Sequence, residues 1–579
     1  MTCNIEWNQE SKTMKLLIKT SIISILILKS LTSYAAPENP VLLFSDLISA
    51  PASGWNNASP NKGAVVTIWG RYFGADRGAN FVTVNGVQLQ ANSDYLDAWG
   101  EYNNPVPFLQ TITFQLNDLM TAGDGTISVT VGGSTSNTIP FRINASSIFF
   151  VDDVAGTGTG TFADPWGESG IDNMVDAMTP GDVVYFRGGV YDDAYNGGKS
   201  PIWVRSSEPA GTIQDPIAYV GYPNEDAFMD GITNGDTSNF NKGIKIDARQ
   251  YTISKFRVAA VGNGISVGRN GRIIGNDVVG ATQFVAGVGI IQTGSDGVKI
   301  YANTTHGARS LDKLDHSIYM SGCQEIEGAD IAYNYSYDNY FDRGPHFVDN
   351  HQVNRCASNV YMKSNHWRHN VIVCGEDETG TPGGVDNRSR GIGIYDLSWD
   401  AGEANEPEPA YIYNNLLIGC GKGWYGAMYH NNGHAKFFNN TLVNSRGKGI
   451  QVTGGLSLST EIKNNVFIHE AGISDNYIDF SQGNSTPDVS NNSYFGGTPS
   501  AYAGDLNPVT ADPQVTVNVA SAHPVTIAAT SPLIGAGDPS VLNIVIDDFD
   551  SIVRPNPIGI GAVEFFTISN EGVFTNGFE

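Results

Sequence analysis

Three short stretches, residues 414–418 (NNLLI), 439–443 (NNTLV) and 464–468 (NNVFI), decide the fold of this chain. Each is an asparagine pair followed by apolar or β-branched residues, and successive stretches are 25 residues apart. A period in the mid-twenties is typical of one coil, or rung, of a β-solenoid. A single asparagine in this context recurs with intervals of 27, 31, 36, 45, 25, 25 and 27 residues at Asn276, Asn303, Asn334, Asn370, Asn415, Asn440, Asn465 and Asn492. Asparagines in such register predict a structural ladder whose side chains hydrogen-bond one another at a tight corner.

A second strand recurs in each rung, as in HSIYM from His316 and GIGIY from Gly391. Alternation with a period of two predicts that four side chains of these segments point into the core: Ile318, Met320, Ile392 and Ile394. Their neighbours should face outward. We place four residues in this outward column: Tyr319, Tyr361, Tyr395 and His430.

The composition favours an all-β protein with many turns. The chain has 579 residues, 67 of them glycine, and only 16% are charged. Its formal net charge of −26 disfavours binding to nucleic acid or to anionic membranes. A polyanionic substrate would also be repelled, unless basic residues gather locally.

The N-terminus is typical of an export signal. If translation starts at Met14, two lysines precede an apolar run over residues 20–28, and cleavage is expected before Ala36. Residues 1–35 are therefore interpreted as a signal peptide, with 1–13 as an upstream extension. The apolar run is too short to span a membrane. We expect a secreted, periplasmic or cell-surface protein, and a monomer.

Four cysteines follow this signal and would meet an oxidising compartment. Four cysteines can form two disulfides in three different ways. We favour Cys323–Cys356 with Cys374–Cys420, because each disulfide would join neighbouring rungs. Four buried free thiols are the alternative. The absence of a C-x-x-C spacing disfavours a zinc site.

Residues 37–143 contain short alternating strands with hairpin signals, which predict a β-sandwich. The segments VTIWGRYFG (66–74), VTVNG (82–86) and ISVTVGG (127–133) resemble the IPT/TIG immunoglobulin-like family. That resemblance implies a spacer or binding module, and we assign no chemistry to it.

Residues 149–191 contain FFVDDVAGTGTGTFADPWG and later MVDAMTPGDVVYFRGGVY, with a short helix expected around residues 171–178. This segment resembles the N-terminal cap of the pectate-lyase-like superfamily. The resemblance implies a right-handed single-stranded parallel β-helix, which we place at residues 147–566, followed by a tail at 567–579. It also implies a polysaccharide lyase, often with Ca²⁺.

The rungs after Asn303, Asn334 and Asn370 exceed the plain period, so their extra residues must leave the coil as loops. Eight of the ten histidines lie between His306 and His434. Stacked loops beside a parallel sheet predict a groove suited to an extended polymer.

Elimination on a uronic-acid polymer needs a cation near the carboxylate, a base and an acid. Five residues are the catalytic candidates: Lys313, His316, Tyr319, Arg343 and Asp338. Seven are expected to bind substrate: Arg309, His346, Arg388, Arg390, Tyr395, Tyr425 and His430. Asp315 and Asp342 are candidate Ca²⁺ ligands.

Two other functions stay open. Asp315, Asp338 and Asp342 could instead serve a glycoside hydrolase, which uses two carboxylates. A non-catalytic carbohydrate-binding protein or adhesin is the third reading. His366 and His369 flank Trp367 at a corner, and we expect both histidines to serve packing.

Overall fold

The computed structural model describes residues 39–565, except 103–104, 155, 193–199, 232–242, 261, 281–288, 294–295, 308–315, 322–326, 340–346, 352–362, 375–389, 397–407, 422–424 and 482–485. Residues 39–566 form one compact unit. The expected signal peptide and C-terminal tail lie outside the described residues. No helix in the described part of the chain is long and apolar enough to cross a membrane.

The N-terminal part consists of two small, mostly antiparallel sheets. Apolar side chains between them, including Val66, Ile68, Val82 and Phe114, are completely buried. One sheet has the order β1 (Val41–Ser45), β3 (Lys62–Arg71), β6 (Gln110–Asn117). The other has the order β2 (Ser49–Pro51), β9 (Ile139–Asn144), β7 (Gly123–Val131), β4 (Phe81–Val84), β5 (Val87–Leu89), with β8 (Ser134–Thr135) paired to β7.

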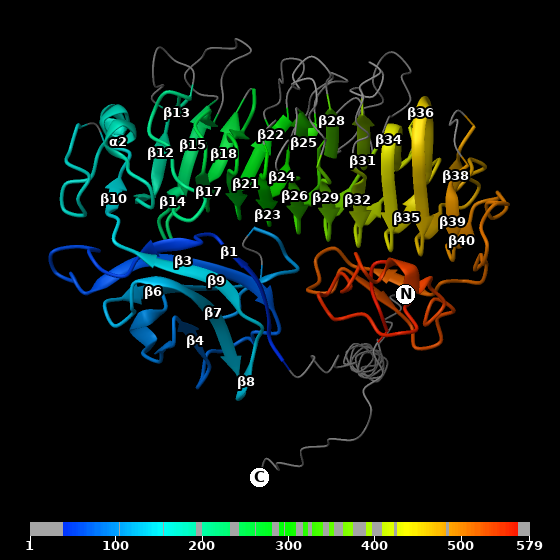
Figure 1. Ribbon diagram of the computed structural model, residues 1–579, viewed down its shortest axis with the longest axis horizontal. Helices are drawn as coiled ribbons and strands as arrows, with labels where there is room; N and C mark the ends of the chain where they lie inside the picture. The colour runs from blue at the N-terminus through cyan, green and yellow to red at the C-terminus, as the bar shows by residue number, and fades with distance from the viewer. Residues whose placement is uncertain are drawn as a thin grey trace, which may run out of the picture. The chain divides into compact units, whose positions relative to one another are not determined.

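From β10 onward the chain is a parallel β-helix whose rungs stack along its length (Figure 1). The strand pairings between rungs divide its strands among three parallel ladders, which we call sheets 1, 2 and 3. Sheet 1 contains β13 (Ile202–Val204), β16 (Ile244–Ile246), β19 (Ile265–Ser266), β22 (Gly289–Thr293), β25 (His316–Ser321), β28 (Phe347–His351), β31 (Ile392–Asp396), the first parts of β34 (Met428–Phe438) and β36 (Ile450–Lys463), and β38 (Ile478–Asp479). Sheet 2 contains β10 (Ile148–Val151), β11 (Val183–Phe186), β14 (Ile217–Gly221), β17 (Tyr251–Ser254), β20 (Arg272–Ile274), β23 (Lys299–Tyr301), β26 (Asp330–Ala332), β29 (His366–Arg368), β32 (Ala410–Tyr413), the later parts of β34 and β36, and β39 (Asp488–Ser490). Sheet 3 contains β12 (Gly189–Tyr191), β15 (Ala227–Gly231), β18 (Arg257–Ala260), β21 (Asp277–Gly280), β24 (Thr304–His306), β27 (Tyr335–Ser336), β30 (Val371–Val373), β33 (Leu416–Ile418), β35 (Thr441–Ser445), β37 (Val466–His469) and β40 (Ser493–Gly496).

The predicted asparagine ladder is confirmed at the corner between sheets 2 and 3. In each rung the asparagine Nδ2 donates to Oδ1 of the next ladder asparagine at 3.0 Å, from Asn276 through Asn492. The same Oδ1 atoms accept the backbone N–H of the preceding ladder residue, as Asn370 does for Asn334 at 3.0 Å. Asp505 closes the ladder by accepting from Asn492 Nδ2 at 2.9 Å. These bonds satisfy polar groups that are wholly buried.

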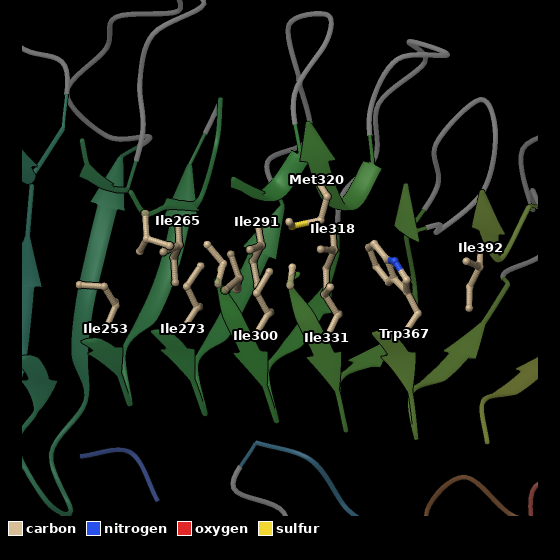
Figure 2. Close-up of a cluster of buried hydrophobic side chains, with 14 of the residues drawn as sticks. Ile253, Ile265, Ile273, Ile291, Ile300, Ile318, Met320, Ile331, Trp367 and Ile392 are labelled. Carbon is tan, nitrogen blue, oxygen red and sulfur yellow. The ribbon is translucent and has the colours of Figure 1, made fainter. Parts of the chain in front are cut away.

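The core of the β-helix is a set of stacked apolar columns. Figure 2 shows Ile265, Ile291, Ile318 and Ile392 from sheet 1 facing Ile253, Ile273, Ile300, Ile331 and Trp367 from sheet 2. Ile318, Met320, Ile392 and Ile394 all belong to this core, so their predicted inward orientation is confirmed. At the N-terminal end, α2 (Ile171–Ala177) buries Ile171, Met174 and Val175 against the same core. A terminal rung needs such a cap because it has no further neighbour.

The N-terminal sheets and the C-terminal segment, which we define as the chain after β40, both pack on the outside of the β-helix. Tyr185 of β11 exchanges hydrogen bonds with the main chain of Val65 at 2.7 and 2.8 Å. Arg71 donates to the carbonyl of Phe549 at 3.0 Å and lies 2.9 Å from Asp550. The C-terminal segment itself contains the hairpin β41 (Val515–Val517) and β42 (Val525–Ile527). These shared contacts explain why both parts fall within one compact unit.

The predicted pair Cys374–Cys420 is a disulfide, with a Cα–Cα distance of 5.1 Å. It joins the residues that follow β30 and β33, which are neighbouring strands of sheet 3. The second predicted disulfide, Cys323–Cys356, lies outside the described residues.

We expect the double variant Cys374→Ala/Cys420→Ala to lose about 4 kcal/mol of unfolding free energy. The disulfide spans 46 residues, and closing such a loop restricts the unfolded chain by an amount that grows with loop length. Urea unfolding under non-reducing conditions measures this difference. An unfolding curve identical to that of the wild type would contradict the expectation.

Candidate functional site

Two of the predicted catalytic residues lie side by side on β25 of sheet 1. His316 and Tyr319, both on β25, stack with ring centroids 4.8 Å apart and an interplanar angle of 10°. Tyr319 is partly exposed and His316 is largely buried. Because Ile318 and Met320 point into the core, Tyr319 between them faces outward, as predicted.

Strand register extends this outer face over further rungs. Tyr319 pairs with Val348 of β28, which pairs with Gly393 of β31, which pairs with Tyr429 of β34. The distance from Tyr319 to Tyr429 is therefore three strand spacings, roughly 14 Å. Tyr395 pairs with Asn431 in the neighbouring outward column, so its predicted orientation is also confirmed.

Two of the residues predicted to bind substrate, Tyr395 and Tyr425, lie together with Tyr429 around a third, the cation Arg390. The Arg390 guanidinium carbon lies 5.1, 4.7 and 5.6 Å from the ring centroids of Tyr395, Tyr425 and Tyr429 respectively. Arg390 Nη1 also donates a hydrogen bond to Tyr395 Oη. A side chain at Gly393 would come within 3.1 Å of the Arg390 side chain, so glycine makes room for it. We name Arg390, Tyr395, Tyr425 and Tyr429 the tyrosine cage.

The cage tyrosines also contact each other. Tyr429 packs against Tyr425 at 4.8 Å, nearly perpendicular, and against Tyr395 at 5.1 Å. Its Oη accepts a hydrogen bond from Thr453 Oγ1 at 2.7 Å. Burial raises the pKa of Tyr429, which keeps its hydroxyl protonated. The cage thus offers phenol hydroxyls and aromatic surface, suited to the hydroxyls and ring faces of sugars.

Two predictions need correction here. Arg390 is wholly buried, so its guanidinium holds the tyrosine rings and is not placed to grip a substrate carboxylate directly. His430 is also wholly buried, because it pairs with Ile394 and Val452 in an inward column. The outward position belongs to Tyr429, which sequence reasoning missed. The sequence contains a signal for this outward position. Met428 pairs with the inward Ile392, so the next residue, Tyr429, must face outward.

The other predicted residues are distributed differently. Asp338 is exposed at the corner between sheets 3 and 1, where its main-chain carbonyl accepts from Gly307 N at 3.0 Å. Tyr361 and seven predicted site residues lie outside the described residues: Arg309, Lys313, Asp315, Asp342, Arg343, His346 and Arg388. Cys323 and Cys356 lie outside them as well. In the described part of the chain, no three His, Cys, Asp or Glu side chains are grouped so as to hold a metal ion.

No family model and no curated protein matches this sequence. Among solved structures, the chain is similar to pectate lyase Pel9A, with a TM-score of 0.44, 14% identity, and coverage of 72% of this chain and 97% of that one. XylC in complex with xylose gives a TM-score of 0.37 at 10% identity, covering 72% and 98%. The PL6 family alginate lyase AlyGC gives 0.31 at 10%, covering 74% and 60%.

If this protein cleaves a polymer that the cage tyrosines bind, Arg390→Met should raise KM about tenfold and leave kcat within twofold. Methionine keeps much of the apolar volume, but it loses the cation–π contacts, each worth about 0.5–2 kcal/mol. Steady-state kinetics on the cleaved polymer measures the two constants separately. Lys436→Met, an outward cation on sheet 2, is the matched control. A fall in kcat at unchanged KM would contradict a positioning role for Arg390.

Proposed function

We propose that this protein is a secreted polysaccharide lyase that cleaves a uronic-acid-containing polymer on the outer face of sheet 1. The observation that carries the proposal is that His316 stacks on Tyr319, which faces outward on β25 in the same strand register as Tyr429 of the tyrosine cage. A proton-transfer pair beside a row of aromatic side chains suits an extended sugar chain.

In this reaction His316 takes the proton from C5 of the uronate, and Tyr319 protonates the leaving O4 oxygen. The electrons of the C5–H bond form the C4–C5 double bond as the C4–O4 bond breaks. One product has a new reducing end and the other an unsaturated uronate end, so atoms and charge balance. The carboxylate must be neutralised while C5 carries negative charge. We assign that role to Lys313 and Arg343, with Arg309, His346 and Arg388 binding neighbouring uronates.

The chain's net charge of −26 makes local cations necessary for such a substrate. Asp315 and Asp342 remain our candidates for Ca²⁺, the ion that would supply further neutralisation if bound. We further propose that the N-terminal sheets are an IPT/TIG-like accessory module.

The test is to incubate the mature protein with a panel of polyuronates and neutral glycans. Ultraviolet absorbance reports unsaturated uronate ends, and a reducing-sugar assay reports every cleavage. The proposal predicts both signals with a polyuronate and neither signal with His316→Ala. Reducing ends without absorbance would identify a hydrolase, and binding without cleavage would identify a carbohydrate-binding protein; either result would overturn the proposal.

A further inference from the structure

The outer face of sheet 2 carries a column of polar side chains that the proposed reaction does not use. Strand register aligns them from rung to rung. In chain order the column contains Arg272, Lys299, Asp330, His366, Tyr411, Lys436, Glu461 and Asp488. The inward neighbours on the same strands, such as Ile331 and Trp367, are completely buried.

Most charges of this face are neutralised by close partners. Lys299 lies 2.9 Å from Glu327, Arg368 lies 2.8 Å from Asp330, and Lys436 lies 2.8 Å from Glu461. His366 and Tyr411 are different. Within the described part of the chain, neither side chain forms a hydrogen bond or ion pair, and their rings stack at 5.0 Å and 19°. The His366 imidazole and the Tyr411 hydroxyl can therefore form hydrogen bonds with a ligand at this point of the column.

A pocket lies beside His366, on the side opposite Tyr411. Its volume is about 510 Å³, within the range of ligand pockets, and its floor is formed by Lys299, Asp330, His366 and Arg368. Lys299 and His366 are two strand spacings apart, roughly 10 Å. That width accommodates one sugar ring over the Asp330–Arg368 pair.

The far wall of the pocket comes from the C-terminal segment, at Ile544, Ile546 and Asp547. This wall is fixed in place, because Asn414 Nδ2 donates to the carbonyl of Asp547 at 2.8 Å and His369 Nε2 lies 2.9 Å from the carbonyl of Asp548. Ile546 is 63% exposed. It offers the pocket an apolar surface opposite the polar floor.

We propose that this pocket binds neutral sugar residues of a polysaccharide, separately from the reaction site on sheet 1. A pyranose ring has an apolar face for Ile546 and a rim of hydroxyls for the Asp330, Arg368 and His366 groups. The lining contains two cations, Lys299 and Arg368, against three carboxylates, Glu327, Asp330 and Asp547. Because the carboxylates outnumber the cations among these described lining residues, the pocket has no unpaired positive charge that would attract an anionic sugar. Burial lowers the pKa of His366, so a neutral imidazole can both donate and accept a hydrogen bond.

Isothermal titration calorimetry of the full chain with neutral hexasaccharides, namely xylohexaose, cellohexaose and mannohexaose, tests the proposal. We expect at least one of them to bind with a Kd between micromolar and millimolar. His366→Ala should weaken that binding at least tenfold, and Ile546→Ser at least threefold. Lys436→Ala, two strands further along the same column, should leave it unchanged. Thermal melting confirms that each variant folds.

Lack of binding by every neutral hexasaccharide would overturn the proposal, as would equal binding by wild type and His366→Ala. Tighter binding of a uronate hexasaccharide at this pocket, lost in His366→Ala, would overturn the assignment to neutral sugars. Lyase activity on a short polyuronate should be the same in His366→Ala and wild type. A failure of this inference is therefore distinguishable from a failure of the proposed reaction.

Discussion

Replacing Tyr319 with phenylalanine should lower kcat by about 10²–10⁴-fold and leave KM nearly unchanged. The substitution removes only the hydroxyl, so the ring can still stack on His316 at the observed 4.8 Å. Loss of a positioned proton donor costs this much in general acid catalysis, whereas substrate binding by the tyrosine cage is untouched. Initial rates from ultraviolet absorbance over a range of polymer concentrations give both constants.

Tyr335→Phe is the matched control, because Tyr335 is a partly exposed tyrosine on β27 of sheet 3. Its kcat should stay within twofold of the wild type. Full activity in Tyr319→Phe, or an equal loss in both variants, would show that Tyr319 is not the acid.

The second large effect concerns stability. Asn370→Leu should reduce the free energy of unfolding by about 3–5 kcal/mol. Asn370 Oδ1 accepts from the backbone N–H and from Nδ2 of Asn334, both at 3.0 Å, and Asn370 Nδ2 donates to the carbonyl of Ile331 at 2.9 Å. Leucine has a similar shape but leaves these buried groups without their partner, at about 1–3 kcal/mol for each group.

Urea unfolding followed by circular dichroism measures the change. Asn507→Ala serves as the control, since Asn507 is an exposed asparagine outside the ladder, and it should shift stability by no more than about 0.5 kcal/mol. If Asn370→Leu costs less than about 1 kcal/mol, the ladder does not stabilise the fold in the way described.

The repeat made the architecture predictable, because a rung must place its asparagine and its apolar strand residues at fixed positions. The spacing of Asn415, Asn440 and Asn465 was enough to predict the ladder, and alternation around Ile318 and Ile392 predicted the core. Pairing of Cys374 with Cys420 followed from the same stacking.

The site was harder to predict, because a one-residue change in register moves a side chain from one face of a strand to the other. His430 was placed outward for that reason, whereas Tyr429 holds the outward position. His366 packs on Tyr411, as expected, but it also lines a pocket, which was not predicted. That pocket needs a wall from residues 544–547, nearly two hundred positions later in the chain, which no local pattern around His366 reveals.

The most direct test of the central claim is a crystal structure of the Tyr319→Phe variant soaked with a uronate hexasaccharide. We predict sugar rings across β25, β28, β31 and β34 on the outer face of sheet 1, with one uronate C5 within reach of His316. A hexasaccharide bound instead over sheet 2 or sheet 3, with sheet 1 bare, would contradict the account.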